Sequence, residues 1–145
     1  MFYEPKKGDH GLPKNPFNSL VMPRPIGWIS SLDADGVINV APYSFFNAVC
    51  YRPPTVMFAG GAGPSPDEGG DWSKDSRRNI EATGDFVCNL TTWDTREQMN
   101  QTSASVPPDV DEMALAGLTP EASQMVKAPR IAEAPVHLEC RHIKS

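Results

Sequence analysis

The sequence contains few residues that could form a covalent or metal framework. Its three cysteines, Cys50, Cys88 and Cys140, are odd in number and lie far apart. This is not the spacing of a disulfide-rich domain or of a zinc site, whose cysteines come in close pairs. The three histidines are also scattered and form no ligand set with the cysteines. We therefore expect reduced thiols that behave as apolar side chains, and no metal site.

Long apolar runs and basic segments are also missing. No run approaches the ~20 apolar residues of a membrane span, and the N-terminal segment lacks the apolar core of a signal peptide. The formal charge is −5, with acidic and basic residues interspersed, so we expect no basic surface for nucleic acid. These observations predict a cytoplasmic protein that binds neither nucleic acid nor membranes. A chain of 145 residues suits a single domain that buries roughly two-thirds of its unfolded surface.

Familiar catalytic motifs are absent as well. No serine lies in a G-x-S-x-G elbow, and no pair of carboxylates has a spacing that identifies acid–base catalysis. The glycines between Gly60 and Gly63 follow a strand-like run, but their spacing differs from the dinucleotide pattern G-x-G-x-x-G. Pro64 and Pro66 oppose an immediate helix. We predict a loop from Gly60 to Asp71, and a phosphate-binding loop is the alternative.

Two short runs of apolar and polar residues predict a β-hairpin. They span Arg24–Leu32 and Val37–Phe46, and the turn-forming residues Asp33 to Gly36 join them. The tightest register places Leu32 opposite Val37. Pro42 should interrupt the ladder of the second strand, because proline has no N–H group to donate.

The predicted hairpin has two unlike faces, because side chains alternate along a strand. We expect one face to point into the core, with Ile29, Ile38 and Val40. The other carries Trp28, Ser30 and Asn39, and an ordinary solvated face is one interpretation of it. Tyr43-Ser44-Phe45-Phe46-Asn47 then crowds aromatic, hydroxyl and amide groups together. This mixture favours a flat heteroaromatic ligand, which needs apolar contact on its faces and hydrogen bonds at its edges.

The residues from Ser73 to Gly84 predict a helix with well-formed ends. Ser73 suits the N-cap, Asp75 suits the positive end of the helix dipole, and Gly84 suits the left-handed position after the C-terminus. The first turn also carries Lys74, Ser76 and Arg77. A helix start with cations and hydroxyls can bind an anion. An ordinary capped surface helix is the alternative.

The remaining elements are shorter. Further strands are predicted at Thr55–Ala59, Asp85–Thr91 and Ala134–Arg141, and the last of these alternates most regularly. A short helix is predicted at Asp94–Ala104, with helical turns near Glu112–Ala116 and Pro120–Val126. Residues 1–20 show no sustained periodicity and predict an extended arm that lies on the surface or on a partner subunit.

Three ordered segments carry a resemblance to a known family. The segments PRPIGWISSLDADGVINVAPYSFFN, KDSRRNI and GDFVCNL resemble the flavin reductase-like family, which has the FMN-binding split-barrel fold. The similar segments cover most of the chain from Met22 to Arg141. The resemblance implies a mainly β fold with peripheral helices, a split β-barrel formed by residues 21–145. Family members continue with further strands, so we expect this domain to be C-terminally incomplete.

The resemblance also implies a cofactor and its site. In the family, a lysine-aspartate-hydroxyl helix start lies at the flavin phosphate. For such a ligand, we expect backbone amides near Ser44–Asn47 to bond the polar edge of the flavin, and side chains from Trp28 to Ser31 to line the ring and ribityl chain. The residues expected to bind FMN are Trp28, Ile29, Ser30, Ser31, Ser44, Phe45, Asn47, Lys74, Asp75, Ser76 and Asn79. No catalytic side chain is expected, because flavin carries the chemistry and the protein binds and orients it.

The expected function is that of an NAD(P)H-dependent flavin reductase. Hydride would pass from NAD(P)H to flavin, and then electrons to another flavin, another acceptor or a partner monooxygenase. One alternative is a non-enzymatic FMN-binding electron carrier, and another is a truncated module that acts only in protein association. The family's flavin site lies at a two-fold interface, so the resemblance also implies a homodimer.

Overall fold

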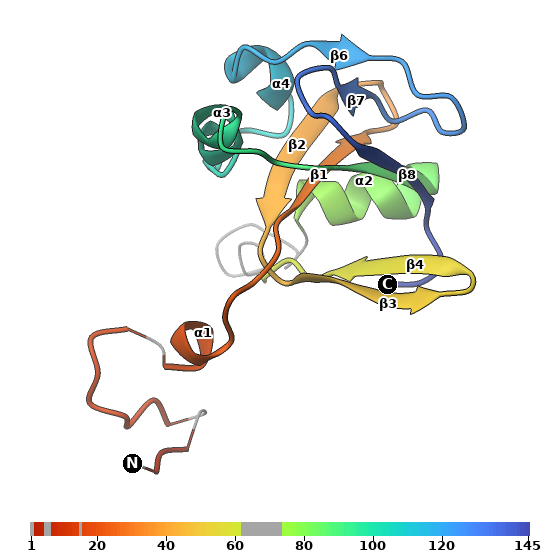
Figure 1. The fold of residues 1–145 in the computed structure, drawn as a ribbon. Coiled ribbons are helices and arrows are strands. Elements are labelled where there is room, and N and C mark those ends of the chain that lie inside the picture. The colour runs from red at the N-terminus through yellow and green to blue at the C-terminus, as the bar shows by residue number, and fades with distance from the viewer. Residues whose placement is uncertain (1, 5–6, 15, 62–73) are drawn as a thin grey trace.

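The computed structural model describes residues 2–4, 7–14, 16–61 and 74–145. It is mainly β, with short helices around the strands (Figure 1). The elements follow in the order α1 (Pro16–Leu20), β1 (Gly27–Leu32), β2 (Ile38–Tyr43), β3 (Phe46–Tyr51), β4 (Pro54–Phe58), α2 (Asp75–Thr83), β5 (Asp85–Asn89), α3 (Arg96–Gln101), α4 (Glu112–Leu115), β6 (Pro120–Glu121), β7 (Arg130–Ile131) and β8 (His137–Arg141).

A four-stranded antiparallel sheet forms the centre of the fold. Its strand order is β2-β1-β5-β8, so the GWISSL segment of β1 lies between two neighbours. The residues from Trp28 to Ser31 are fully buried, which means that both faces of β1 are covered. The sheet is not closed, and β3 pairs only with β4 in a separate hairpin beside α2 (Figure 1). The predicted mainly β architecture with peripheral helices is confirmed.

The predicted hairpin exists, but its register is shifted by one residue. Leu32 pairs with Ile38 rather than with Val37. The cause is the Asp33 side chain, whose Oδ1 accepts hydrogen bonds from the N–H groups of Asp35 at 2.9 Å and Val37 at 2.8 Å. These bonds hold Val37 in the turn and lengthen the loop. A one-residue slip exchanges the faces of one strand relative to the other.

The register places apolar residues on both faces of the sheet, and the two faces pack into separate clusters. Val40 and Trp28 lie in a cluster with side chains of α4 and β7, whereas Ile29 lies in the cluster on the opposite face. The expectation that Ile29 and Val40 share one inward face is therefore wrong. The second cluster joins Ile29 to Ile80 of α2 and to the partly buried Phe58 of β4.

The predicted strand Val37–Phe46 is divided into two strands. β2 ends at Tyr43, and β3 begins at Phe46 in a different sheet. Pro42, where the sequence predicted an interruption, remains paired with Trp28. The break comes two residues later, at Ser44 and Phe45, and it turns the SFFN corner out of the main sheet.

The helix predicted from the KDSRRNI segment is α2. Lys74 is at its N-cap, and Gly84 follows its last turn with φ 83°, in the left-handed region. The Gly84 N–H donates to the Ile80 carbonyl at 2.9 Å, as expected of a glycine in this position. Ser73, the residue predicted to cap the helix, and most of the predicted Gly60–Asp71 loop lie outside the described residues.

Other predicted elements agree less uniformly with the structure. Strands β5 and β8 and helices α3 and α4 fall within the predicted segments, and β4 is shifted by one residue from the predicted Thr55–Ala59. The helical turn predicted near Pro120–Val126 is wrong, because β6 starts there and pairs with β7. The arm of residues 1–20 contains the short helix α1, which the sequence did not predict, and it extends away from the sheets (Figure 1). Among the described residues, no helix has the length and apolar character to cross a bilayer.

A buried amide at the end of β5 joins several strands. Asn89 is fully buried, and its Nδ2 donates to the Trp28 carbonyl at 3.1 Å and to Ser30 Oγ at 3.0 Å. Its Oδ1 accepts from the Ile131 N–H at 3.1 Å and lies 3.0 Å from His137 Nδ1. One side chain thus connects β1, β5, β7 and β8.

Candidate functional site

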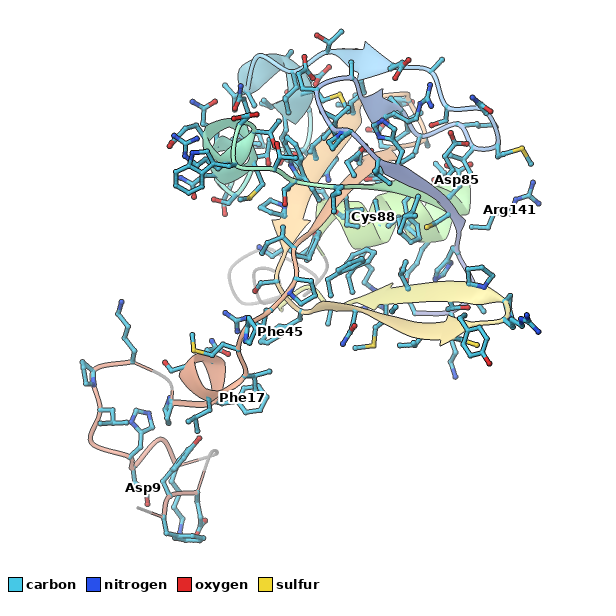
Figure 2. All side chains as sticks on the ribbon, in the orientation of Figure 1. Asp9, Phe17, Phe45, Asp85, Cys88 and Arg141 are labelled. Carbon is cyan, nitrogen blue, oxygen red and sulfur yellow. The ribbon has the colours of Figure 1, made fainter. Side chains whose placement is uncertain are left out.

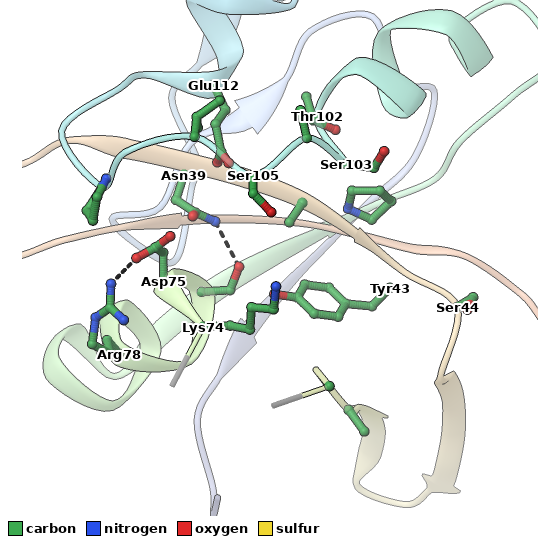
Figure 3. Close-up of a pocket in the computed structure, with 18 of the residues that line it drawn as sticks. Asn39, Tyr43, Ser44, Lys74, Asp75, Arg78, Thr102, Ser103, Ser105 and Glu112 are labelled. Atoms are coloured by element: carbon green, nitrogen blue, oxygen red, sulfur yellow. Dashed lines mark hydrogen bonds and ion pairs between the residues drawn. The ribbon is translucent and has the colours of Figure 1, made fainter. Parts of the chain in front are cut away.

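A cavity of about 780 Å³ opens at the end of the sheet (Figure 3). Three walls form it: the start of α2, the end of β2 with the following corner, and the segment between α3 and α4. This volume lies within the range of small-molecule sites. The lining residues are Asn39, Ala41, Pro42, Tyr43, Ser44, Phe45, Ala59, Gly61, Lys74, Asp75, Ser76, Arg78, Thr102, Ser103, Ala104, Ser105, Val106, Pro108 and Glu112.

The start of α2 supplies positive charge and hydroxyl groups to the first wall. Lys74 is exposed at the N-cap and Ser76 is buried in the first turn. Arg78 is ion-paired with Asp75 one turn earlier (Figure 3). The positive end of the helix dipole lies at the same place. This wall therefore attracts an anion.

The second wall comes from β2 and the corner that follows it. Asn39 lies 2.8 Å from Ser76, between its Nδ2 and the serine Oγ. Tyr43 is largely buried, and burial raises the pKa of its phenol above the usual value, although a hydrogen bond with Ser76 acts in the opposite direction. The phenol is therefore neutral at physiological pH. Ser44 and Phe45 continue the wall toward the solvent, and Phe45 lies near Phe17 of the arm (Figure 2), with their ring centroids 6.5 Å apart.

The role of the third wall was not predicted from the sequence. It is the segment TSASVPP, residues 102–108, which connects α3 to α4 without regular structure of its own. Thr102 anchors the segment because its Oγ1 accepts a hydrogen bond from the Trp28 indole Nε1 at 2.9 Å. Ser103 and Ser105 are exposed and line the cavity, and the Ser103 hydroxyl donates to the Asn100 carbonyl at 2.6 Å. The segment has no hydrophobic periodicity. Its one recognisable signal was the pair of prolines after Val106, which indicated only that a helix had ended.

Glu112 is one of two acidic residues that line the pocket, and no motif in the sequence marked it. Its side chain is buried and its Oε2 accepts a hydrogen bond from the Val40 N–H at 2.6 Å. Burial raises the pKa of this carboxyl to about 7, against the effect of that hydrogen bond, and the nearby Asp75 and Asp111 add to the rise. Glu112 therefore changes charge near neutral pH.

The structure brings together about half of the residues expected to bind a cofactor. Those that line the cavity are Ser44, Phe45, Lys74, Asp75 and Ser76. Trp28, Ile29, Ser30 and Ser31 are fully buried in β1, and none of them lines the cavity. Asn79 of α2 lies against β1, where its Nδ2 donates to Ser31 Oγ at 3.4 Å. Asn47 is exposed on β3, and its Oδ1 accepts from the neighbouring Ala48 N–H at 2.9 Å.

The chemistry of the lining fits a ligand with an anionic end and a planar apolar part. Lys74 and Ser76 supply donors at the start of α2, Tyr43 supplies an aromatic ring next to Ser76, and Phe45 adds aromatic surface on the corner after β2. A phosphate ester of a heteroaromatic compound has this distribution of groups. The described residues contain no cluster of His, Cys, Asp and Glu able to hold a metal ion. The fold and the site thus define a mainly antiparallel β protein with a pocket that carries cationic and hydroxyl groups on one wall.

Comparison with known families agrees with this class of protein. The family model described as "Flavin reductase like domain" matches residues 18–145. The chain belongs to this family, and its fold is the flavin reductase-like split barrel. Membership implies a flavin ligand.

Curated relatives are similar over most of this chain. An uncharacterized protein of Aquifex aeolicus (strain VF5) is 44% identical over 125 residues, which are 86% of this chain and 61% of the relative. The uncharacterized protein YwrF of Bacillus subtilis (strain 168) is 37% identical over 126 residues, or 85% and 58% of the two chains. The chain thus spans between half and two-thirds of the length of the curated relatives it matches.

Solved structures are similar as well. Nitrilotriacetate monooxygenase component B from Bacillus cereus is 30% identical, with a TM-score of 0.81 over 97% of this chain and 67% of that one. The NADH:FAD oxidoreductase SgcE6 of Streptomyces globisporus C-1027 has a TM-score of 0.73 over 99% of this chain and 75% of that one. At 19% identity, the second similarity concerns the fold alone.

Proposed function

We propose that this chain is an FMN-binding flavin reductase that uses NAD(P)H as the hydride donor. The observation that carries the proposal is the start of α2, where Lys74 and Ser76 line a cavity that the aromatic residues Tyr43 and Phe45 also line. FMN has the matching distribution of groups, with a phosphate at one end and a planar ring at the other. Membership of the flavin reductase-like family supports the assignment of this cavity to a flavin.

Each cofactor-binding residue has a defined role in this proposal. Lys74 and Ser76 donate charge-assisted hydrogen bonds to the phosphate, and Asp75 fixes the start of α2 through its ion pair with Arg78. Asn79 and the buried residues from Trp28 to Ser31 support the ring and ribityl chain from behind the wall. Ser44, Phe45 and Asn47 border the ring at the SFFN corner.

The protein's contribution to the reaction is binding and orientation. When bound, FMN supplies the hydride and electron transfer. The backbone amides of the Ser44–Asn47 corner offer hydrogen-bond donors to the polar edge of the ring, and Tyr43 and Phe45 exclude water from its face. A partner monooxygenase is one acceptor of the electrons, and the similarity to a monooxygenase component B supports this choice.

The first experiment asks whether the purified protein binds flavin and reduces it. We expect a yellow protein with the flavin absorbance bands, whose bands bleach during anaerobic titration with NADH or NADPH. A flavin that stays oxidised under both titrations would identify an electron carrier. A colourless protein that does not bind added FMN would instead indicate a module that acts only in protein association.

A second prediction concerns the fluorescence of Trp28. The indole of Trp28 bonds to Thr102, which lines the cavity, so FMN in the cavity lies close to it. FMN binding should quench part of the tryptophan fluorescence, and Trp28→Phe should remove part of that quenching. Trp72 and Trp93 give the remaining signal. If Trp28→Phe leaves the quenching unchanged, Trp28 does not lie near the flavin.

We also propose that residues 1–20 form an arm on a domain of residues 21–145, and that two chains associate as a homodimer. Exposed apolar side chains support this proposal: Val49, Tyr51 and Met57 on the β3–β4 hairpin, and Phe17 and Leu20 on α1. Large exposed apolar areas mark association surfaces. The reduced cysteines, all free in the structure, support assignment to the cytoplasm.

Dimerisation should be linked to flavin binding, since residues of both chains would contact each FMN. A ligand that binds only the dimer favours dimer formation, and dilution then releases the ligand. Sedimentation velocity with and without FMN measures this linkage. We expect FMN to shift the protein toward the dimer at micromolar concentration. A species that carries flavin and remains monomeric would rule out the shared site.

A further inference from the structure

Phe45 is an aromatic residue of the pocket whose side chain lies outside the hydrophobic core. Its backbone is fixed, since its carbonyl accepts from the Ala59 N–H at 2.8 Å. The ring of the next residue, Phe46, packs against the second cluster and directly on Gly27, where a Cβ would lie 2.5 Å from that ring. Among the described residues, neither buried cluster includes Phe45. Its half-buried side chain lines the cavity instead.

Two side chains from the segment before β1 contact the Phe45 ring. The guanidinium carbon of Arg24 lies over the ring, 5.1 Å from its centroid. The Phe17 ring of α1 lies 6.5 Å away, centroid to centroid, with the two ring planes tilted by 49°. Both distances are in the range of attractive cation–π and aromatic contacts. Figure 2 shows Phe17 and Phe45 where α1 meets the rest of the fold.

A hydrogen bond connects Arg24 to the same helix that carries Phe17. Arg24 Nη1 donates to the Asn18 carbonyl of α1 at 3.2 Å, and Phe17 is the residue before Asn18. The guanidinium group thus contacts both α1 and the Phe45 ring. The position of α1 beside the corner after β2 therefore determines both contacts to Phe45.

A phenylalanine side chain on a cavity wall has to be ordered when a ligand packs against it. It can rotate about χ1 and χ2, and fixing such a side chain on binding lowers affinity by about two- to tenfold. Contacts that already hold the side chain in the free protein remove this loss. The contacts of Phe17 and Arg24 should therefore raise the affinity for a ligand that packs on Phe45.

We propose that Phe17 and Arg24 are positioning residues of the flavin site, which hold Phe45 in the orientation that packs on the flavin ring. With both contacts in place, Phe45 is ordered before the flavin binds. The segment before β1 then contributes to ligand binding within its own chain, in addition to any role in association. This inference rests on the proposed function, and it extends the same site from the sheet and α2 to α1.

A double-mutant cycle on flavin binding tests this role. The dissociation constants of FMN and riboflavin would be measured for wild type, Phe17→Ala, Phe45→Ala and the double variant. We expect Phe17→Ala to weaken the binding of both flavins by about two- to tenfold, because the two ligands share the same ring. In the Phe45→Ala background, Phe17→Ala should change neither affinity, because the side chain that Phe17 positions is gone.

Three further variants separate positioning from a general effect on α1, with circular dichroism as the check that each is folded. Phe17→Tyr keeps the ring at an exposed position and should bind both flavins like wild type. Asn18→Ala removes an exposed side chain but keeps the backbone carbonyl to which Arg24 donates, so it should also bind like wild type. Arg24→Ala removes the cation and the link to α1 together, and it should weaken binding at least as much as Phe17→Ala.

The outcomes distinguish this inference from the proposed function. If Phe17→Ala binds both flavins like wild type, the inference is wrong and the FMN site stands. The same holds if Phe17→Ala weakens binding equally with and without the Phe45 ring, as the loss of a dimer contact would. A loss for FMN alone would also contradict the inference, because the effect would then lie at the phosphate. If wild type binds neither flavin, the proposed function is wrong and the inference falls with it.

Discussion

Lys74→Ala should weaken FMN binding by roughly ten- to a hundredfold. Lys74 is at the N-cap of α2 and lines the cavity, so its ammonium group meets the phosphate where the helix dipole is also positive. A charge-assisted hydrogen bond at such a site contributes roughly 1.5–3 kcal/mol, and each 1.4 kcal/mol changes affinity about tenfold. Titration of the protein with FMN, followed by flavin fluorescence, measures the dissociation constant.

Two controls show whether the lost affinity belongs to the phosphate. Lys127→Ala removes an exposed lysine between β6 and β7 and should leave the affinity unchanged. Riboflavin has no phosphate, so Lys74→Ala should change its affinity much less than that of FMN. An unaltered FMN dissociation constant in a folded Lys74→Ala protein would place the phosphate elsewhere.

Asn89→Ala should lower the free energy of unfolding by about 3–5 kcal/mol. The variant removes two donated hydrogen bonds and two contacts to the amide oxygen, and it leaves the Trp28 carbonyl and the Ile131 N–H without this partner in a buried place. A net hydrogen bond contributes about 1 kcal/mol, and an unsatisfied buried group costs about 1–3 kcal/mol. The loss is a large part of the 5–15 kcal/mol typical of a domain.

Urea denaturation followed by circular dichroism measures this loss. Asn100→Ala, at an exposed position of α3, is the matched control and should change the free energy of unfolding by less than about 0.5 kcal/mol. If Asn89→Ala behaves like that control, the strands β7 and β8 do not depend on the Asn89 amide.

The parts of the fold that depend on local interactions were predictable from the sequence. The C-terminal end of α2 followed from the residues themselves, since Gly84 adopts the left-handed conformation expected of it. The hairpin was also recognised, but its register was wrong by one residue, because the Asp33 side chain binds the Val37 N–H. A turn that is stabilised by a side chain can lengthen without any change in the strand pattern.

The faces of β1 were harder to predict because their burial depends on distant segments. Trp28 and Ser30 looked like a solvated or ligand-binding face, but Met113 of α4 and Ile131 of β7 cover the cluster that contains Trp28. Ser30 Oγ donates to the Pro129 carbonyl at 2.6 Å, across 99 residues of sequence. The sequence of a single strand does not show whether distant segments will bury one of its faces.

The pocket was predictable only where its residues are close in sequence. The first turn of α2 and the SFFN corner carry recognisable local patterns. Glu112 and Asn39 are separated in sequence by more than 70 residues, and α4 packs on β2 to bring them together. Neither residue belongs to a spacing motif, so their connection appears only after the chain has folded.

The position of FMN in a crystal structure of the complex tests the central claim most directly. We expect the phosphate at the start of α2, with its oxygens within hydrogen-bond distance of Lys74 Nζ and Ser76 Oγ, and the ring against the Tyr43–Phe45 corner. A phosphate bound away from the start of α2, with the ring outside the cavity that Tyr43 and Phe45 line, would contradict the account.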